Sequence, residues 1–361
     1  MLEDFEQSER PSTGRSKSII AILVSLGLVL GGLGAGFVLF RDAVGGAIDS
    51  VNARLFVPDY DGQPGPPTVI VIEPGDLGED VARKLVEADV VKSFDAIYRP
   101  MLSVDLVIFP GHYEFPTQIP GAEALALLLE GKNRIVLNTV IPEGWQIAEI
   151  VPRLVADLQL DEAELLAAIA EANERFEGPT LEGYLFPASY NFDPGVSAAT
   201  VVEIMLERMA AELAGYDLKL EDAHKVLTLA SMIQMEGRLE PDFFKISRVF
   251  ANRLEIGMAL QSDPTVKYYY EGSIDSFQQG VADTNNPYNT YFYPGLPPGP
   301  ISSPGALAIE AALNPAAGEW LYFVSINLAT GETVFSNTLA EHERAAELYR
   351  QWLRDNPGWD D

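Results

Sequence analysis

Glu236 stands at the end of a predicted hydrophobic helix, where a carboxyl group can do acid/base chemistry. The segment at 221–236 has a helical period, and Glu236 follows Ile233 by three residues on its apolar face. Desolvation there, and the partial negative charge of a helix end that Gly237 is expected to cap, both raise the pKa of a carboxyl group. A carboxyl group that stays protonated near neutrality can protonate a glycosidic oxygen. The spacing alone leaves open a solvated or salt-bridged Glu.

Other kinds of chemistry find little support in the composition. The chain has no cysteine, which excludes thiolate zinc sites and Cys nucleophiles. Its histidines, His112, His224 and His342, are far apart and form no H-E-x-x-H pair, so no metal site is predicted. His112 and His342 are expected to be ordinary hydrogen-bonded residues. The formal charge of -29 argues against a nucleic-acid partner.

An uncharged apolar run at 18–40 predicts one transmembrane helix, since roughly 20 apolar residues are needed to cross a bilayer. Arg10, Arg15 and Lys17 precede it, so the tail at 1–17 is expected in the cytoplasm and the rest of the chain outside. A cleaved signal peptide is the alternative. The run is longer than a usual signal h-region, and no clear A-x-A site follows it.

The rest of the chain predicts a tether and two α+β domains. A Gly-, Pro- and Asp-rich stretch at 41–67 predicts a flexible linker. A small module at 68–133 begins with a β-branched strand at 68–72 and contains an amphipathic helix at 121–130. A larger domain occupies 134–361. It has predicted strands at 134–141 and 320–327 and predicted helices at 147–158, 161–172, 198–213, 221–236 and 243–256.

Several motifs in the larger domain resemble those of the endolytic murein transglycosylases, the MltG or YceG-like family. They are IPEGWQ at 141–146, LEGYLFPASYNF at 181–192, LASMIQMEG at 229–237, VFANRLEIGMALQSDPTV at 249–266, PYNTYFYPGLPPGPISSPG at 287–305, ALNPAAGEWLYFV at 312–324, and the pair Glu341-His342. They occur in the family's order, and residues 68–132 resemble its LysM-like module. The resemblance therefore implies a LysM-like module followed by a YceG-like catalytic domain.

The resemblance also implies a catalytic residue. The family's catalytic Glu is the second acid of a V-E-K-E-type motif, and Glu236 occupies that position. Two departures stand out: the first acid of the motif is Gln234, and the strand at 331–335 lacks the family's His. Both place in doubt any scheme that needs a second carboxylate beside Glu236 or an imidazole on that strand.

The implied activity is a lytic cleavage of peptidoglycan within its glycan strands. Glu236 would protonate the oxygen between N-acetylmuramic acid and N-acetylglucosamine, then take the proton of the muramyl 6-hydroxyl as that hydroxyl attacks C1. The product is a 1,6-anhydromuramyl end, and no metal or organic cofactor is required. The resemblance further implies penicillin-binding proteins or other wall synthases as partners, and an enzyme that ends the growth of nascent strands at the inner membrane.

Five residues are candidates for binding the sugar by type and by motif membership: Tyr190, Asn252, Asp263, Tyr288 and Asn289. Each has a structural alternative. Tyr190 can pack in the core, the segment around Tyr288 and Asn289 can form a turn, and Asn252 and Asp263 can serve the fold.

Two rival functions remain. In one, Glu236 belongs to a hydrolase with Glu143, Glu182 or Asp263 as partner carboxylate, and the products are reducing sugars. In the other, the protein is a wall-binding anchor without enzymatic activity, and its binding survives loss of Glu236.

Overall fold

The structure, a computed structural model, describes residues 57–105, 107–270 and 277–358. The chain divides into two compact units, Met1–Arg134 and Ile135–Asp361. Both combine helices with small antiparallel sheets, which confirms the predicted α+β class. The predicted transmembrane helix at 18–40 lies outside the described residues. Within the described ranges, no helix has both the length and the apolar character that a bilayer crossing requires.

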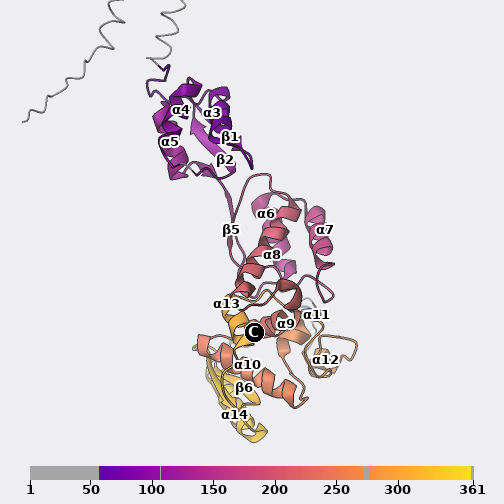
Figure 1. Ribbon diagram of the computed structural model, residues 1–361. Helices are drawn as coiled ribbons and strands as arrows, with labels where there is room; N and C mark the ends of the chain where they lie inside the picture. Colours follow the sequence, from indigo (N-terminus) through magenta and orange to yellow (C-terminus); the bar gives the residue numbers. More distant parts are fainter. Residues whose placement is uncertain (1–56, 106, 271–276, 359–361) are drawn as a thin grey trace, which may run out of the picture. The chain divides into compact units, whose positions relative to one another are not determined.

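The first unit places three helices beside a small sheet (Figure 1). Strand β1 (Pro67–Ile72) pairs antiparallel with β2 (Gly111–Pro116), and the short β3 (Arg134–Ile135) adds a third strand next to β2. The helices are α3 (Gly78–Glu87), α4 (Phe94–Met101) and α5 (Gly121–Glu130). Alternating residues of the strands and one face of each helix form a core around Leu85, Ile97 and Phe115.

The second unit begins with a two-stranded sheet and three helices. Strand β4 (Leu137–Val140) pairs with β5 (Ser189–Phe192). The helices are α6 (Ile147–Leu158), α7 (Glu162–Asn173) and α8 (Ala198–Ala214). Asp161 begins α7 by accepting a hydrogen bond from the main-chain N of Glu164 at 3.0 Å. These elements share one hydrophobic core with the helices that follow.

Helix α9 (His224–Glu236) runs through this core and is buried on most of its sides. Ile233, predicted on the apolar face, is buried, but Leu227 and Met232 on other faces are buried as well. The buried surface of α9 is therefore wider than the single apolar face that the sequence predicts. The helix begins after a 3-10 turn at Leu220–Asp222 rather than at 221. It is followed by α10 (Glu240–Glu255), α11 (Asp263–Tyr269), α12 (Phe277–Ala282) and α13 (Ala306–Leu313).

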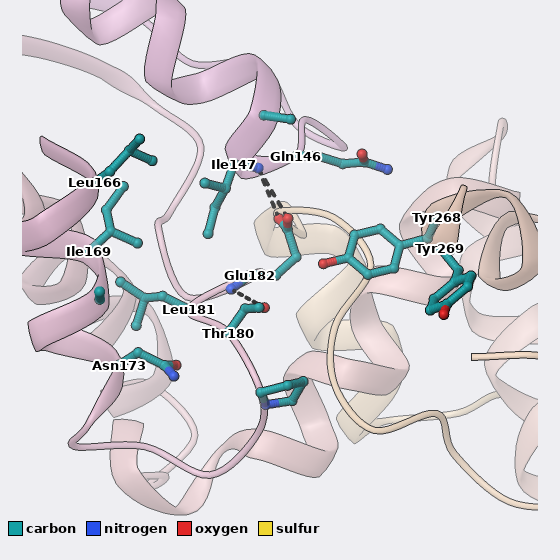
Figure 2. Close-up of a pocket in the computed structure, with 13 residues that line it drawn as sticks. Gln146, Ile147, Leu166, Ile169, Asn173, Thr180, Leu181, Glu182, Tyr268 and Tyr269 are labelled. Atoms are coloured by element: carbon teal, nitrogen blue, oxygen red, sulfur yellow. Dashed lines mark hydrogen bonds between the residues drawn. The ribbon is translucent and has the colours of Figure 1, made fainter. Parts of the chain in front are cut away.

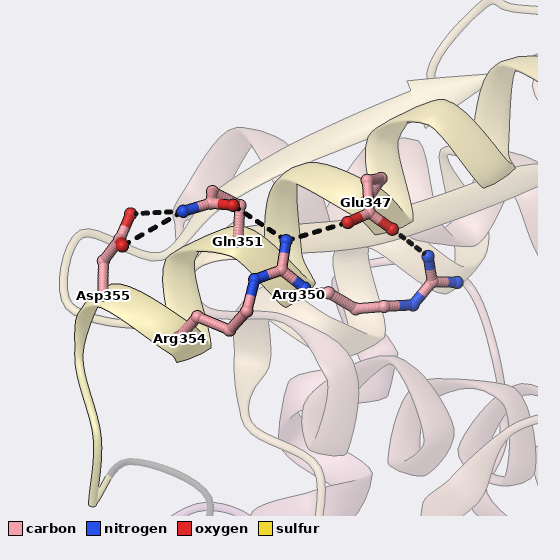
Figure 3. A network of polar contacts seen from close by, with 5 residues as sticks. All are labelled: Glu347, Arg350, Gln351, Arg354 and Asp355. Carbon is pink, nitrogen blue, oxygen red and sulfur yellow. Dashed lines mark hydrogen bonds and ion pairs between the residues drawn. The ribbon is translucent and has the colours of Figure 1, made fainter.

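The C-terminal part is a β-hairpin covered by a long helix. Strands β6 (Tyr322–Asn327) and β7 (Glu332–Ser336) pair antiparallel, and α14 (Leu339–Asp355) begins at a capping box made by Thr338 and Glu341. Figure 3 shows the exposed side of α14, where Glu347, Arg350, Gln351, Arg354 and Asp355 form a chain of polar contacts. Exposed pairs of this kind contribute at most about 1 kcal/mol each, so packing against β6 and β7 holds the helix in place.

Candidate active site

The end of α9 places the carboxyl group of Glu236. Gly237 caps the helix, as expected, with its N–H bonded to the carbonyl of Ile233 at 2.8 Å and its backbone extended at φ -75° and ψ 137°. A Cβ at position 237 would lie 2.5 Å from the ring of Phe243 on α10. Only glycine therefore allows the chain to turn this closely into α10, and the turn leaves Glu236 in the last turn of α9.

The surroundings of Glu236 favour its protonated form. The pKa of its carboxyl group is raised to about 7, mainly by burial and also by the nearby negative charge of Asp263. Ser262 opposes this shift by donating its hydroxyl to Glu236 Oε1 at 2.8 Å, and the positive charges of Lys267 and Arg253 also lower the pKa. The predicted direction of the shift is confirmed, and burial is its main cause.

Glu236 opens into a cleft of about 460 Å³. Its lining comes from the end of α9, the segment that leads into α11, strand β6 and the beginning of α14. The lining residues are Glu236, Arg253, Leu260, Gln261, Asp263, Tyr291, Tyr322, Phe323, Val324, Ser325, Leu339 and His342. Carboxyl, guanidinium, hydroxyl and aromatic groups thus face one space, which is the mixture that sugar rings require.

The serine beside Glu236 is held in place by buried hydrogen bonds. Thr290 Oγ1 accepts a hydrogen bond from the main-chain N of Ser262 at 3.0 Å, and Thr265 Oγ1 donates to the carbonyl of Ser262 at 2.7 Å. The hydroxyls of Thr265 and Thr290 lie 2.9 Å apart. All three residues are buried, so the donor to Glu236 is fixed before any ligand arrives.

Arg253 joins two walls of the cleft. Its guanidinium donates to the main-chain carbonyls of Leu260 at 2.7 Å and Leu321 at 2.6 Å, and it lies 5.3 Å from the centre of the Tyr322 ring. The side chain is buried, so its charge acts on Glu236 with little screening by water. Arg253 therefore connects the two segments by hydrogen bonds and also places a positive charge near Glu236.

The structure brings one of the five predicted sugar-binding residues to the cleft. Asp263 lines it and accepts a hydrogen bond from a tyrosine hydroxyl. Tyr190 and Asn252 use their polar groups on main-chain carbonyls, with shortest distances of 2.6 and 2.8 Å. Tyr288 is buried against another tyrosine ring, and the buried Asn289 donates to three carbonyls. These four serve the fold here, and a role in sugar binding stays a prediction for them.

Sequence reasoning missed several residues that line the cleft or contact its acid. Ser262 and Tyr291 both lie in motifs shared with the family, close to the predicted binding residues Asp263 and Asn289. Their hydroxyl groups, in motifs that also hold candidate site residues, are the sequence feature that could have identified them. Tyr322 and His342 come from β6 and α14, far along the chain from Glu236. An imidazole does face the cleft, although it comes from α14 and not from the strand at 331–335.

A second buried carboxyl group, that of Glu182, belongs to a different pocket of about 490 Å³ (Figure 2). Figure 2 shows its carboxyl group pointing at the main-chain N of Ile147, where α6 begins, at 3.1 Å. Burial raises the pKa of Glu182 to about 7. Because Glu182 satisfies the N-terminus of α6 and does not line the cleft, it is a structural carboxyl group and not a partner for Glu236.

Gln234 shows why the chain tolerates an amide at the position of the motif's first acid. Its Nε2 lies 3.4 Å from Glu143 Oε2, and its Oε1 accepts a hydrogen bond from the main-chain N of Gly305 at 3.0 Å. An amide can donate to the carboxylate and accept from the N–H, whereas a carboxylate here would face another carboxylate. Gln234 and Glu143 therefore hold the Pro- and Gly-rich loop, and neither lines the cleft.

Metal ligands do not gather anywhere in the part of the chain that the structure describes: no group of three or more His, Cys, Asp or Glu side chains is placed to hold an ion.

Comparison with known proteins places these motifs in one family. The profile of the YceG-like family matches residues 70–348. The chain is similar to the endolytic murein transglycosylase of Bacillus subtilis, with 32% identity over 62% of this chain and 68% of the relative. It is also similar to that of Streptococcus pneumoniae, with 30% identity over 72% of this chain, and it spans 53% of that longer relative. A crystal structure of a YceG-like protein from Listeria monocytogenes covers 78% of this chain and 99% of its own, with 30% identity and a TM-score of 0.50. The chain belongs to the YceG-like family.

Proposed function

We propose that the protein is an endolytic lytic transglycosylase of peptidoglycan and that Glu236 is its acid/base residue. The observation that carries the proposal is the state of Glu236, whose carboxyl group opens into a polar cleft with its pKa raised to about 7 by burial. Such a group is protonated in part of the molecules at neutral pH and can both give and take a proton. The similarity to two endolytic murein transglycosylases supplies the substrate class.

The reaction needs one carboxyl group and no water. Glu236 gives its proton to the oxygen between N-acetylmuramic acid and N-acetylglucosamine while the C1–O bond breaks. The muramyl 6-hydroxyl oxygen then bonds to C1, and its proton returns to the Glu236 carboxylate. The nucleophile belongs to the bound sugar, so proximity replaces a second catalytic carboxylate. Asp263, held by Tyr291, adds negative charge next to the developing oxocarbenium ion.

The rest of the chain fits this role as a set of proposals. Residues 68–133 form a LysM-like module that holds glycan, and 134–361 form the catalytic domain. The apolar run at 18–40 anchors the protein in the inner membrane with the tail at 1–17 in the cytoplasm, so that the enzyme works outside the cell membrane. Wall synthases such as penicillin-binding proteins are then the proposed partners, and the end of nascent strand growth is the proposed outcome.

One observation favours a second candidate, a hydrolase. Of the partner carboxylates considered from the sequence, Asp263 lines the cleft with Glu236, whereas Glu143 and Glu182 do not. A hydrolase would use Asp263 as base or nucleophile and release reducing ends. The products therefore separate the two reactions.

The test is mass spectrometry of purified glycan strands after digestion by the full-length protein in detergent. The expected products are internal 1,6-anhydromuramyl ends, and Glu236→Gln should reduce their formation by about a hundredfold to ten-thousandfold, as loss of a general acid and base does. Glu182→Gln is the matched control because it removes a buried carboxyl group with a similarly raised pKa outside the cleft. It should leave the type of product unchanged.

Each other outcome points elsewhere. Reducing ends that disappear in Asp263→Asn would establish the hydrolase. Binding of strands without cleavage, equal in wild type and Glu236→Gln, would establish an anchor without enzymatic activity. Cleavage by Glu236→Gln at the wild-type rate would remove Glu236 from the mechanism.

A further inference from the structure

His342 lines the Glu236 cleft, and its ring nitrogens form no hydrogen bonds that would hold the fold together. The residue comes from the first turns of α14, and its ring stacks on Tyr322 of β6, with ring centres 5.3 Å apart and planes at 24°. Both residues line the cleft. The stack fixes the plane of the imidazole, so its nitrogens have defined directions before a ligand binds.

Neither ring nitrogen of His342 has a hydrogen-bond partner among the described residues. Nδ1 is buried and unpaired. Nε2 forms no hydrogen bond within the described chain and is not among the buried unpaired atoms. A hydrogen on the buried Nδ1 would have no acceptor, which favours the tautomer that carries its hydrogen on Nε2, where a ligand can accept it. The imidazole therefore offers one donor, directed away from the buried side of the ring.

The electrostatic setting keeps this donor neutral. Burial lowers the pKa of His342, and the nearby charge of Arg253 lowers it further, while Glu343 acts in the opposite direction. A neutral imidazole N–H can donate to an uncharged acceptor such as a carbonyl oxygen.

The stack on Tyr322 does not itself require a polar ring, because a phenylalanine would stack there equally well. The packing of the ring therefore gives Nε2 no task within the fold. The adjoining surface of the cleft is apolar, with Phe323 and Val324 of β6 among its lining residues. A donor next to an apolar surface matches an acetamido group, which has a carbonyl oxygen and a methyl group on one planar unit.

We infer that His342 is a substrate-binding residue, which donates from Nε2 to the carbonyl oxygen of an N-acetyl group of the glycan while the methyl group lies against β6. The inference rests on the proposed function, because it takes an N-acetylated glycan as the ligand of the cleft. It gives the cleft a means of selecting N-acetylated sugars over plain hexoses.

The test compares three substitutions that separate the two nitrogens and the ring. In His342→Gln the amide nitrogen occupies the place of Nε2, in His342→Asn it occupies the place of Nδ1, and His342→Phe keeps the stack without a donor. Each is made in the full-length Glu236→Gln protein, so that binding is measured without cleavage. Calorimetry then gives the affinity for the tetrasaccharide of N-acetylglucosamine and for the matching glucose tetrasaccharide.

The expected result is a loss of preference. One hydrogen bond corresponds to roughly a tenfold change in affinity, so the preference for the N-acetylated sugar should fall about tenfold in the Asn and Phe variants. The Gln variant should keep most of it. In the cleaving enzyme with Glu236 intact, the Phe variant should raise KM about tenfold with little change in kcat.

Other results would overturn the inference. A merely structural role predicts that all three variants lose affinity for both tetrasaccharides equally, together with a lower thermal midpoint. Equal preference in the Gln and Phe variants would remove the Nε2 donor from recognition. Failure of the proposed function is recognised separately. In that case the wild-type protein itself, with His342 in place, would yield no anhydromuramyl ends.

Discussion

Replacing Glu236 with Gln should stabilise the protein, and the gain should appear only as the pH rises. Burial raises the pKa of this carboxyl group from its ordinary value of 4.5 to about 7 in the folded chain. A raised pKa means that the folded state binds a proton which the unfolded state has lost, so the contribution of this group to stability is complete below pH 4.5 and disappears as the pH rises through 7. An amide has no such dependence.

The size of the effect follows from the two pKa values. The difference between about 7 and 4.5, at 1.36 kcal/mol for each pKa unit, corresponds to about 3 kcal/mol as an upper limit. Glu236 is partly exposed as a residue, and water in the cleft screens its charge, so about 1–2 kcal/mol is the expected gain. For a domain of this size each kcal/mol changes Tm by about 2–4 °C, which gives roughly 2–8 °C.

The assay is thermal unfolding of wild type and Glu236→Gln at pH 5 and pH 8.5. The two proteins should unfold at nearly the same temperature at pH 5, and the variant should be the more stable at pH 8.5. Glu319→Gln, at an exposed position, is the control and should show no dependence of this kind. If Glu236→Gln is only as stable as wild type at pH 8.5, or less stable, then burial does not disfavour the ionised form of Glu236, and the reasoning is refuted.

Three further substitutions test the contacts around Glu236. Ser262→Ala removes the hydroxyl that lowers the pKa of Glu236, so the apparent pKa in the pH profile of kcat/KM should rise by about one unit. Gln234→Glu places a carboxylate 3.4 Å from that of Glu143 and should lower the denaturation midpoint at pH 8 more than at pH 5. Gly237→Ala drives a Cβ to 2.5 Å from an aromatic ring of α10 and should reduce the free energy of unfolding by about 1–3 kcal/mol.

Each of these has its own control. Ser231→Ala removes another buried serine, which bonds the loop at Ile301 and lies outside the cleft, and should leave the pH profile in place. Gln234→Met should destabilise to the same extent at both pH values. Gly78→Ala is the control for Gly237→Ala, because its φ is likewise not positive and the added Cβ meets nothing closer than the Met101 sulfur at 3.9 Å. A pH profile unchanged by Ser262→Ala would contradict the assigned contact.

The sequence alone determined the α+β class, the bounds of several helices and the candidate acid. Hydrophobic periodicity predicts these features because it is a local property, and residues 121–130 and 147–158 form helices with those same bounds. The motifs around Glu236 identified the family before any geometry was known. The raised pKa of this carboxyl group also followed in direction, because an apolar helix face predicts burial.

The tertiary structure decided which side chains meet Glu236. Arg253 reaches it or its cleft from α10, Ser262 from the segment before α11 and His342 from α14. No local sequence pattern predicts such long-range approaches. In the structure the side-chain amides of Asn252 and Asn289 donate to main-chain carbonyls, because buried N–H groups need a hydrogen-bond acceptor within reach. Residue type and motif membership cannot distinguish an amide that binds sugar from one that holds a loop. That distinction depends on which backbone atoms packing places within 3 Å, a consequence of long-range contacts.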